Sequence, residues 1–522
     1  MEITSHLLAI AGLLVPVLLY NLWRLRISCQ KTKGMLAPEP SGALPIIGHL
    51  HQLRGKNPLA RTLAAMADRH GPVFKIRLGS KSAVVVCNHE AVKECFTTND
   101  KVLAGRPKST QSKYLGYNNA GLGFAPYGAY WREMRKLAMM ELLSAHRLET
   151  LQNVKISEVD TLVKDLYSLC QSNNHSPVKV MISDWIESLT LNIITKIIAG
   201  KRYFGQANGG DDEEAKRVQK IIKEFMCLVG APLISDLLPF LGWIDFGGQV
   251  KSVKRLGREL DTLIGSWIEE HALKRLEREA SDKQADFIDI MLSVIEGDSM
   301  FGHTRETIIK AMVSTFILAG AETTSVNLIW LLSLLLNNEH ALKRVQEELD
   351  LKVGKDRWVE DYDIKDMVYL RAIVKESLRL YPPTPLAVPH EALEDCQVCG
   401  YYVPKGTRLL VNVWKLHRDP RVWEDPNGFL PERFLTSHAH IDALGQHFEF
   451  TPFGLGRRSC PGNTFAMQIS HLAIARLLQG FELTTPENIS VDMTEGFGIT
   501  LPRTTPLQVL LTPRLSSELY GC

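Results

Sequence analysis

Residues 453–462 read Phe453-Gly-Leu-Gly456-Arg-Arg458-Ser-Cys460-Pro-Gly462, which places one cysteine in a glycine-rich loop before an apolar helix. Gly456 and Gly462 allow the backbone to turn tightly and to approach a flat partner closely. The neighbouring arginines and the N-terminus of the following helix favour a thiolate over a thiol. A soft, anionic sulfur is a good ligand for iron, and Phe453 is placed to shield it from water. The loop therefore predicts a metal-binding cysteine.

The same ten residues follow the pattern F-x-x-G-x-R-x-C-x-G with every fixed position filled. This pattern resembles the haem-binding signature of the cytochrome P450 superfamily, the haem-thiolate monooxygenases. The resemblance implies haem b as cofactor and Cys460 as the axial iron ligand, with four more loop residues at the cofactor: Phe453, Gly456, Arg458 and Gly462. For a lone cysteine the alternative is a buried structural residue in a turn. The complete match favours the metal ligand.

The composition is that of a large globular protein. The chain has 522 residues, of which 45% are hydrophobic and 23% charged, so it can bury a large core. Its net charge of +2 gives no indication of a nucleic-acid partner. Nine cysteines are scattered along the chain without the pattern of a disulfide framework, which predicts a reducing compartment.

An apolar run from Leu7 to Trp23 is followed, not preceded, by basic residues such as Arg24 and Arg26. As a helix this run is about 25 Å long, near the lower limit for crossing a bilayer. A cleaved signal peptide is the alternative, but its basic residues would come first. We therefore predict a single-pass anchor in residues 1–34, and the positive-inside rule places the rest of the chain in the cytosol.

Prolines crowd residues 35–50, so the anchor helix must end there in a stiff, extended hinge. This segment resembles the hinge of microsomal members of the superfamily, which implies the endoplasmic reticulum membrane. The resemblance extends over essentially the whole chain. It implies one catalytic domain, residues 35–522, with a mainly α-helical fold and a small β-rich lobe. Alternation at residues 73–87 predicts two strands of that lobe.

Residues 304–336 predict one long helix in which Glu322 is the single charged residue from Ala311 onward. A charge at the middle of a membrane span costs about 2.5–3.5 kcal/mol, so a buried core helix is favoured over a span. Residues 319–324, Ala-Gly-Ala-Glu-Thr-Thr, form a polar notch in it. Gly320 permits close approach of a ligand or local opening, and the Thr323 hydroxyl can donate and accept hydrogen bonds. The notch resembles the family's oxygen-activation motif, which implies Thr323 and Glu322 as the catalytic proton-delivery pair.

Two further motifs concern the cofactor. Trp131 and Arg135 share a helix face, which on many helices is only an aromatic ring packed on an arginine stem. The family's W-x-x-x-R pattern makes them haem-propionate donors instead, and His390 matches another propionate-binding position. Glu376 and Arg379, three residues apart, resemble the family's E-x-x-R pair, completed by Arg433. This ion network is expected to hold the loop that leads to Cys460.

Two stretches allow competing interpretations. Residues 233–246 are apolar but too short to cross a membrane. They fit either a surface that dips into the bilayer near a substrate entrance or plain core packing. Cys396 and Cys399 form a C-x-x-C, but no second pair completes a zinc site, and the following residues predict a strand and turn.

Within the superfamily the chain looks like a plant microsomal enzyme, most similar to the plant family numbered eighty-two. That resemblance implies O2 insertion into a small apolar flavonoid, terpenoid or alkaloid, by hydroxylation or oxidative demethylation. NADPH acts only through a separate reductase, cytochrome b5 is a second candidate donor, and Arg132, Lys136 and Arg457 are candidate docking residues. The alternatives are a reductase-independent enzyme that rearranges hydroperoxides and a non-catalytic membrane haem sensor. The intact Glu322–Thr323 pair favours the monooxygenase.

Overall fold

The computed structural model describes residues 34–55, 57–173, 176–205, 213–277 and 285–521. The predicted anchor lies outside the described residues except for Gly34. Residues 35–43 of the predicted hinge form neither helix nor strand, and residues 44–49 form a turn before a helix begins at Leu50. The segment lies on the globular domain: the backbone N–H of Lys75 donates to Pro38 O (2.8 Å), and that of Tyr402 to Met35 O (2.7 Å). The hinge is therefore part of the folded domain.

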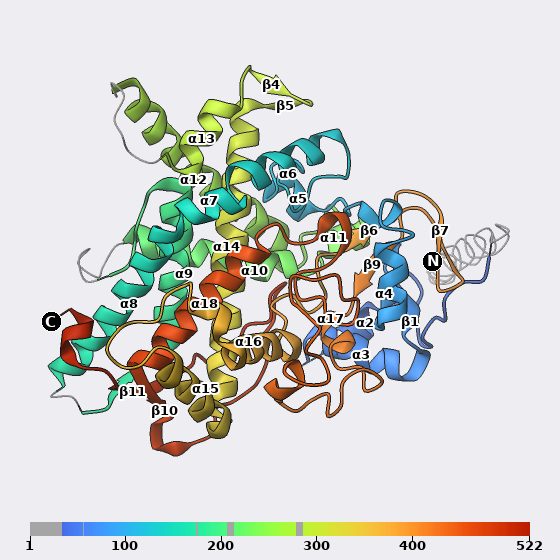
Figure 1. The fold of residues 1–522 in the computed structure, drawn as a ribbon. Helices are drawn as coiled ribbons and strands as arrows, with labels where there is room; N and C mark the ends of the chain where they lie inside the picture. Colours follow the sequence, from blue (N-terminus) through green and yellow to red (C-terminus); the bar gives the residue numbers. More distant parts are fainter. Residues whose placement is uncertain (1–33, 56, 174–175, 206–212, 278–284, 522) are drawn as a thin grey trace, which may run out of the picture.

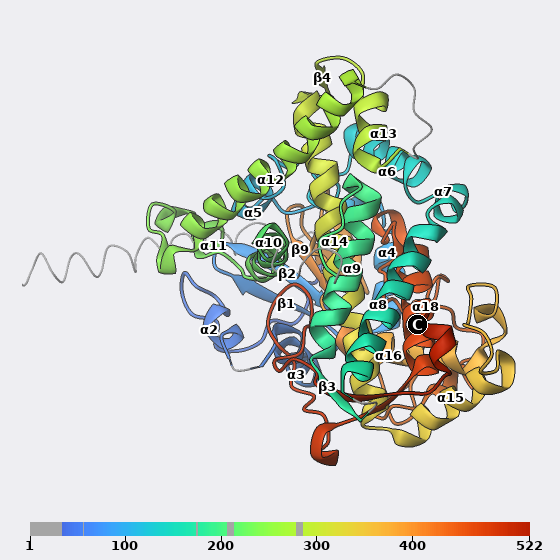
Figure 2. The same ribbon diagram turned by 90° about the vertical axis from the view of Figure 1, so that its left-hand side faces the viewer.

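The fold is mainly helical, and the helices gather around one central helix, α14 (Figure 1). The other α-helices are α2 (Leu50–Leu53), α3 (Leu59–His70), α4 (His89–Phe96), α5 (Thr110–Tyr114), α6 (Ala129–Glu141), α7 (Ala145–Thr150), α8 (Gln152–Ser172), α9 (Ile182–Ala199), α10 (Glu213–Gly230), α11 (Ile234–Leu237), α12 (Gln249–Glu277), α13 (Phe287–Val294), α15 (Glu339–Lys352), α16 (Val368–Leu380), α17 (Val413–Leu416) and α18 (Asn463–Gly480). Figure 2 shows α9 running alongside α14, and these two helices pack together.

Helix α14 (Arg305–Leu336) confirms the predicted long core helix. Thr304 caps its first turn by accepting a hydrogen bond from the backbone N–H of Thr307. Within the described part of the chain, α14 is the one helix long and apolar enough to cross a membrane, but 78% of its most apolar window is buried inside the protein. Its apolar side chains form the main core with α8, α9, α16 and α18.

The β-rich lobe contains a four-stranded sheet in the order β1-β2-β9-β6. Strands β1 (Val73–Leu78) and β2 (Lys81–Val86) are the two strands predicted from residues 73–87, and the structure pairs them antiparallel. Strand β9 (Arg408–Val411) runs parallel to β2, and β6 (His390–Glu391) is antiparallel to β9. A second sheet has the order β10-β11-β3, from Phe481–Thr484, Val509–Pro513 and Val178–Val180. Two hairpins complete the strands: β4 (Ser299–Met300) with β5 (His303–Thr304), and β7 (Cys396–Val398) with β8 (Tyr401–Val403).

The ion network predicted around Glu376 is present and buried. Arg379 donates Nε to Glu376 Oε2 and Nη2 to Oε1, both at 2.8 Å, and Arg433 Nε donates to Oε1 at 3.1 Å. The three side chains are at most 4% exposed. Both guanidiniums also donate to backbone carbonyls between residues 417 and 428. One carboxylate thus fixes two arginines that hold the segment after α17.

His417 extends this network to the cysteine loop. Its Nδ1 faces Arg379 O at 3.2 Å, so Nδ1 carries the proton, and its Nε2 accepts the backbone N–H of Thr451 at 2.8 Å. Burial and the guanidiniums of Arg379 and Arg418 lower the pKa of His417 to about 3, which keeps the ring neutral and able to accept. This path connects α16 to residue 451, nine positions before Cys460.

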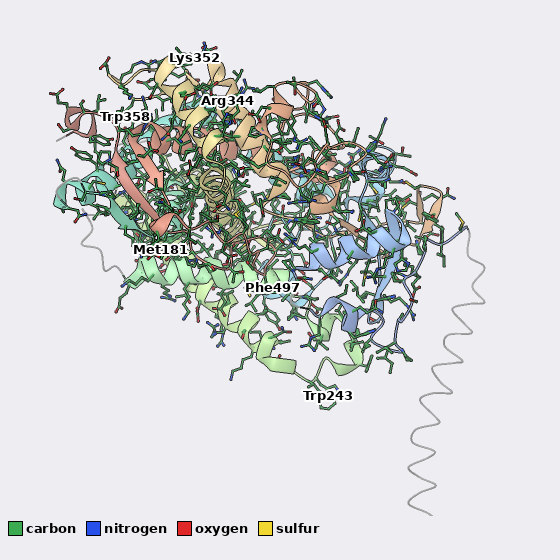
Figure 3. The ribbon with its side chains drawn as sticks, turned by 90° about the horizontal axis from the view of Figure 1, so that it is seen from below. Met181, Trp243, Arg344, Lys352, Trp358 and Phe497 are labelled. Atoms are coloured by element: carbon green, nitrogen blue, oxygen red, sulfur yellow. The ribbon has the colours of Figure 1, made fainter. Side chains whose placement is uncertain are left out.

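The two ambiguous stretches are resolved differently. In residues 233–246, Leu237 and Leu238 are buried, whereas Phe240 is 57% exposed and Trp243 is 82% exposed (Figure 3). One part of the stretch is therefore packed in the core, and another part is exposed at the surface, where contact with a bilayer stays a prediction. The C-x-x-C lies on the β7–β8 hairpin, so the predicted strand and turn are confirmed.

Candidate active site

A cavity of about 340 Å³ separates the cysteine loop from α14. Its wall is largely apolar and is built from the cysteine loop, the start of α18, the notch of α14, α9 and the segment 383–390. Ala319 is exposed although it lies in the middle of a buried helix, because it faces this cavity. The fold therefore leaves a space between the predicted iron ligand and the predicted catalytic helix.

The cysteine loop is held by its own backbone. The N–H of Cys460 donates to Phe453 O at 2.9 Å, and both residues line the cavity. Gly456 has a φ of +67°, and a Cβ atom there would lie 2.3 Å from Asp100 Oδ1, so the predicted tight turn is confirmed and its close neighbour is Asp100. Gly462 lines the cavity, and a Cβ atom added to it would meet no other atom within 4 Å. That open space at Gly462 fits a flat group lying against the loop.

The expectation that the loop itself favours a thiolate is wrong. Burial raises the pKa of the Cys460 thiol, and the hydrogen bond from the Gly462 backbone and the charge of Arg135 oppose that rise only in part. A helix N-terminus and nearby arginines do not outweigh the loss of water around the sulfur. A bound metal ion deprotonates a coordinating thiol outright, so the same site suits a metal-bound thiolate.

Two half-buried guanidiniums beside the cavity donate hydrogen bonds only to carbonyls. Arg106 donates to Gly123 O, Val388 O and Pro389 O at 2.8–3.1 Å, and Arg458 donates to Ala104 O and Ala125 O at 2.5 Å. Among the residues that the structure describes, neither has a carboxylate partner in hydrogen-bond range. Burial lowers the pKa of Arg458 to about 10 and that of Arg106 well below its usual value. Two half-buried cations without a carboxylate partner are unfavourable, and the two propionates of a haem would neutralise them.

Sequence reasoning missed Arg106. The signal in the sequence is slight: one arginine between Gly105 and Pro107, directly after the apolar residues 102–104. Its position is set by the tertiary fold. The backbone N–H of Glu391 donates to Gly105 O at 3.1 Å, which ties the residue before Arg106 to β6.

The other predicted haem contacts lie around the same cavity, with their own partners. Trp131 lines the cavity, and its indole N–H (Nε1) donates to Leu122 O at 3.2 Å. The guanidinium carbons of Arg458 and Arg135 lie 4.8 and 5.5 Å from the centre of its ring. Arg135 does not line the cavity and donates Nη2 to Ser459 Oγ at 3.3 Å.

His390 also lines the cavity. It is buried, and its Nδ1 bonds Leu103 O at 2.7 Å. Burial and the charge of Arg106 hold its pKa well below the usual range, so the ring is neutral with the proton on Nδ1. Because a propionate only accepts hydrogen bonds, binding it through Nε2 would need a second proton on the ring, at Nε2.

The notch on α14 places its two catalytic candidates differently. Thr323 faces the cavity, and its Oγ1 donates to Ala319 O at 2.7 Å, which leaves the oxygen lone pairs free to accept. Glu322 is not among the lining residues. A Cβ atom on Gly320 would lie 2.8 Å from Ile194 Cδ1, so this glycine serves the close packing of α14 on α9 as well as lining the cavity.

The carboxyl of Glu322 points to the segment around Thr500, near the C-terminal end of the chain. Its Oε1 accepts the Thr500 hydroxyl at 2.6 Å, while Oε2 is buried without a hydrogen-bond partner. Burial raises the pKa of Glu322 to about 7, against the lowering effect of the Thr500 bond. The carboxyl therefore changes charge near neutral pH, beside the notch and outside the cavity.

Comparison with known proteins agrees with this geometry. The family model described as Cytochrome P450 matches residues 38–510. Cytochrome P450 CYP82J17 of Trigonella foenum-graecum is 52% identical over 99% of both chains, and vinorine hydroxylase of Rauvolfia serpentina is 49% identical over 100% of both. Nicotine N-demethylase CYP82E3 of Nicotiana tomentosiformis is 47% identical over 98% of this chain and 99% of its own.

Proposed function

Since this chain belongs to the cytochrome P450 family and is a monooxygenase, we propose that it takes electrons from NADPH through a separate reductase and oxidises an apolar plant specialised metabolite. The observation that carries the proposal is the cavity between Cys460 and the Thr323 face of α14. Its apolar wall suits a flavonoid, terpenoid or alkaloid. The names of two relatives support hydroxylation and demethylation as the reaction types.

In this proposal Cys460 holds the iron of haem b, and Arg106 and Arg458 bind its propionates, with His390, Trp131 and Arg135 nearby. Phe453 and Gly462 line the face of the loop on which the ring lies. When bound, the haem supplies the activation of O2. The chain's own residues exclude water, place the substrate against α14 and deliver protons from the Glu322 side through the Thr323 hydroxyl.

The proposed function is tested in membranes that contain the full chain, with and without a plant NADPH–cytochrome P450 reductase. NADPH and a panel of flavones, terpenoids and alkaloids are added, and products are analysed by mass spectrometry. We expect a product that is heavier by one oxygen, or one that lacks a methyl group of the substrate, only when the reductase is present. Oxidation of a hydroperoxide without reductase would favour the rearranging enzyme instead.

Replacing Thr323 by alanine is expected to separate electron consumption from product formation. The variant loses the hydroxyl that positions protons at the cavity, and positioned proton transfer contributes about 10²-fold or more to rate. NADPH oxidation should continue while most electrons are released as hydrogen peroxide. Thr323→Ser is the matched control, because it keeps the hydroxyl and should keep the coupling. Tight coupling in Thr323→Ala would remove this residue from its proposed role.

The proposed reductase-docking surface consists of Arg132, Lys136 and Arg457. All three are exposed, and Arg457 bonds Tyr127 Oη at 3.0 Å beside the cysteine loop. Attraction between a basic patch and an acidic partner mainly accelerates association. Reversing all three charges is expected to slow reductase-dependent turnover by about tenfold at low salt. Lys343→Glu with Lys352→Glu, on α15, is the control; Lys352 is labelled in Figure 3. Unchanged turnover in the triple variant would refute this surface.

We also propose that the enzyme lies on the endoplasmic reticulum membrane with its catalytic domain in the cytosol. Exposed Phe240 and Trp243 support contact of residues 239–243 with the bilayer, because large apolar side chains prefer the interface. In proteoliposomes of the full chain, brominated lipids should quench the fluorescence of Trp243. Equal quenching in Trp243→Phe would exclude that contact.

A further inference from the structure

Among the residues that the structure describes, one donates a hydrogen bond to the Glu322 carboxyl, and it comes from a distant part of the chain. Thr500 is 2% exposed, and its hydroxyl lies 2.6 Å from Glu322 Oε1, while Oε2 has no partner. A buried carboxylate is unfavourable unless its oxygens accept hydrogen bonds. The Thr500 hydroxyl is therefore the hydrogen bond, within the described chain, that stabilises the ionised form of Glu322.

The backbone around Thr500 is fixed by its neighbours on either side. The N–H of Ile499 donates to Met226 O of α10 at 3.1 Å, and that of Leu501 donates to Pro383 O at 2.9 Å. Trp330 Nε1 of α14 donates to Leu501 O at 2.6 Å. Three elements thus hold the hydroxyl in place, so its bond to Glu322 is pre-organised.

The charged groups that face Glu322 come from the two helices packed against this part of α14. They are Glu187 of α9, which raises its pKa, and Lys223 of α10, which lowers it. Because Lys223 Nζ pairs with Glu187 Oε2 at 2.7 Å, the two charges largely cancel at Glu322. The Thr500 bond is the larger of the two effects that favour the ionised carboxyl.

We propose that Thr500 is a positioning residue for Glu322, whose hydroxyl stabilises the carboxylate left behind each time Glu322 gives up its proton. The step is a proton transfer: the carboxyl O–H bond breaks, the Thr323 hydroxyl accepts this proton while it passes its own to the oxygen substrate in the cavity, and Oε1 keeps the hydrogen bond from Thr500. A proton from solvent then restores the acid. The inference rests on the proposed role of Glu322 as a proton donor.

The test is an infrared pH titration of the full-length haem-loaded protein. The C=O stretch of protonated Glu322 is identified as the band that Glu322→Gln removes. In Thr500→Val we expect the titration midpoint of this band to rise by about one pH unit, because a hydrogen bond to the charged form is lost. Thr500→Ser should restore the midpoint. Thr504→Val, at an exposed position of the same segment, should leave it unchanged.

A midpoint that is the same in Thr500→Val as in the unmodified protein would overturn the inference. A second measurement separates it from the proposed function. Protonated Glu322 is the donor, so the share of NADPH electrons that reaches product should fall as pH rises through its midpoint, and Thr500→Val should move that fall to higher pH by the same amount. If Glu322→Gln leaves this pH profile unchanged, the donor role of Glu322 fails, and with it the catalytic meaning of the Thr500 bond.

Discussion

Cys460→Ala is expected to abolish both turnover and the absorption band of the reduced, carbon-monoxide-bound haem thiolate. Cys460 is the cavity-lining cysteine of the signature loop, and its backbone N–H is fixed to Phe453 O. Without a thiolate there is no anionic sulfur to donate electron density to the iron. A fall in product formation of at least about 10³-fold is expected, equivalent to roughly 4 kcal/mol in the barrier.

Cys399→Ala is the matched control, because Cys399 is an exposed cysteine on the β7–β8 hairpin. It should keep the thiolate band and the activity of the unmodified chain. Circular dichroism of both variants shows whether the fold is intact. A Cys460→Ala protein that retained the band and the turnover would refute the assignment of the iron ligand.

Glu376→Ala is expected to be among the most destabilising single substitutions in the chain. It leaves the guanidiniums of Arg379 and Arg433, which are 0% and 4% exposed, without their shared carboxylate. Removing one partner of a buried ion network costs about 3–5 kcal/mol, because the remaining charges stay buried and unpaired. We expect a lower unfolding temperature and poor haem retention, since the network reaches the cysteine loop through His417 and Thr451.

Glu339→Ala is the control for this prediction. Glu339 also pairs with a basic residue on its own helix, Lys343 at 3.5 Å, but the two side chains are 80% and 69% exposed. An exposed pair contributes only about 0.3–0.5 kcal/mol. Both variants are compared by circular dichroism during heating and by haem content. Similar unfolding temperatures for Glu376→Ala and Glu339→Ala would contradict the structural role of the network.

The sequence by itself determined the features that short spacing can express. The loop around Cys460, the long helix 304–336, the two strands within residues 73–87 and the i, i+3 relation of Glu376 and Arg379 were all predictable, because their members are close in the chain. The family signature assigned the candidate ligand and the candidate notch. It did so without any information on which way each side chain points.

Only the tertiary structure decided the partners of these residues. Arg106 and Arg458 are 352 positions apart, and Glu322 and Thr500 are 178 apart. No local pattern relates such pairs, since their positions relative to each other depend on how separate helices and loops pack. Burial, which raises the pKa of Cys460 and Glu322, is likewise a property of the packed fold. Spacing thus specified which groups carry the chemistry, and packing specified their charge, their direction and their neighbours.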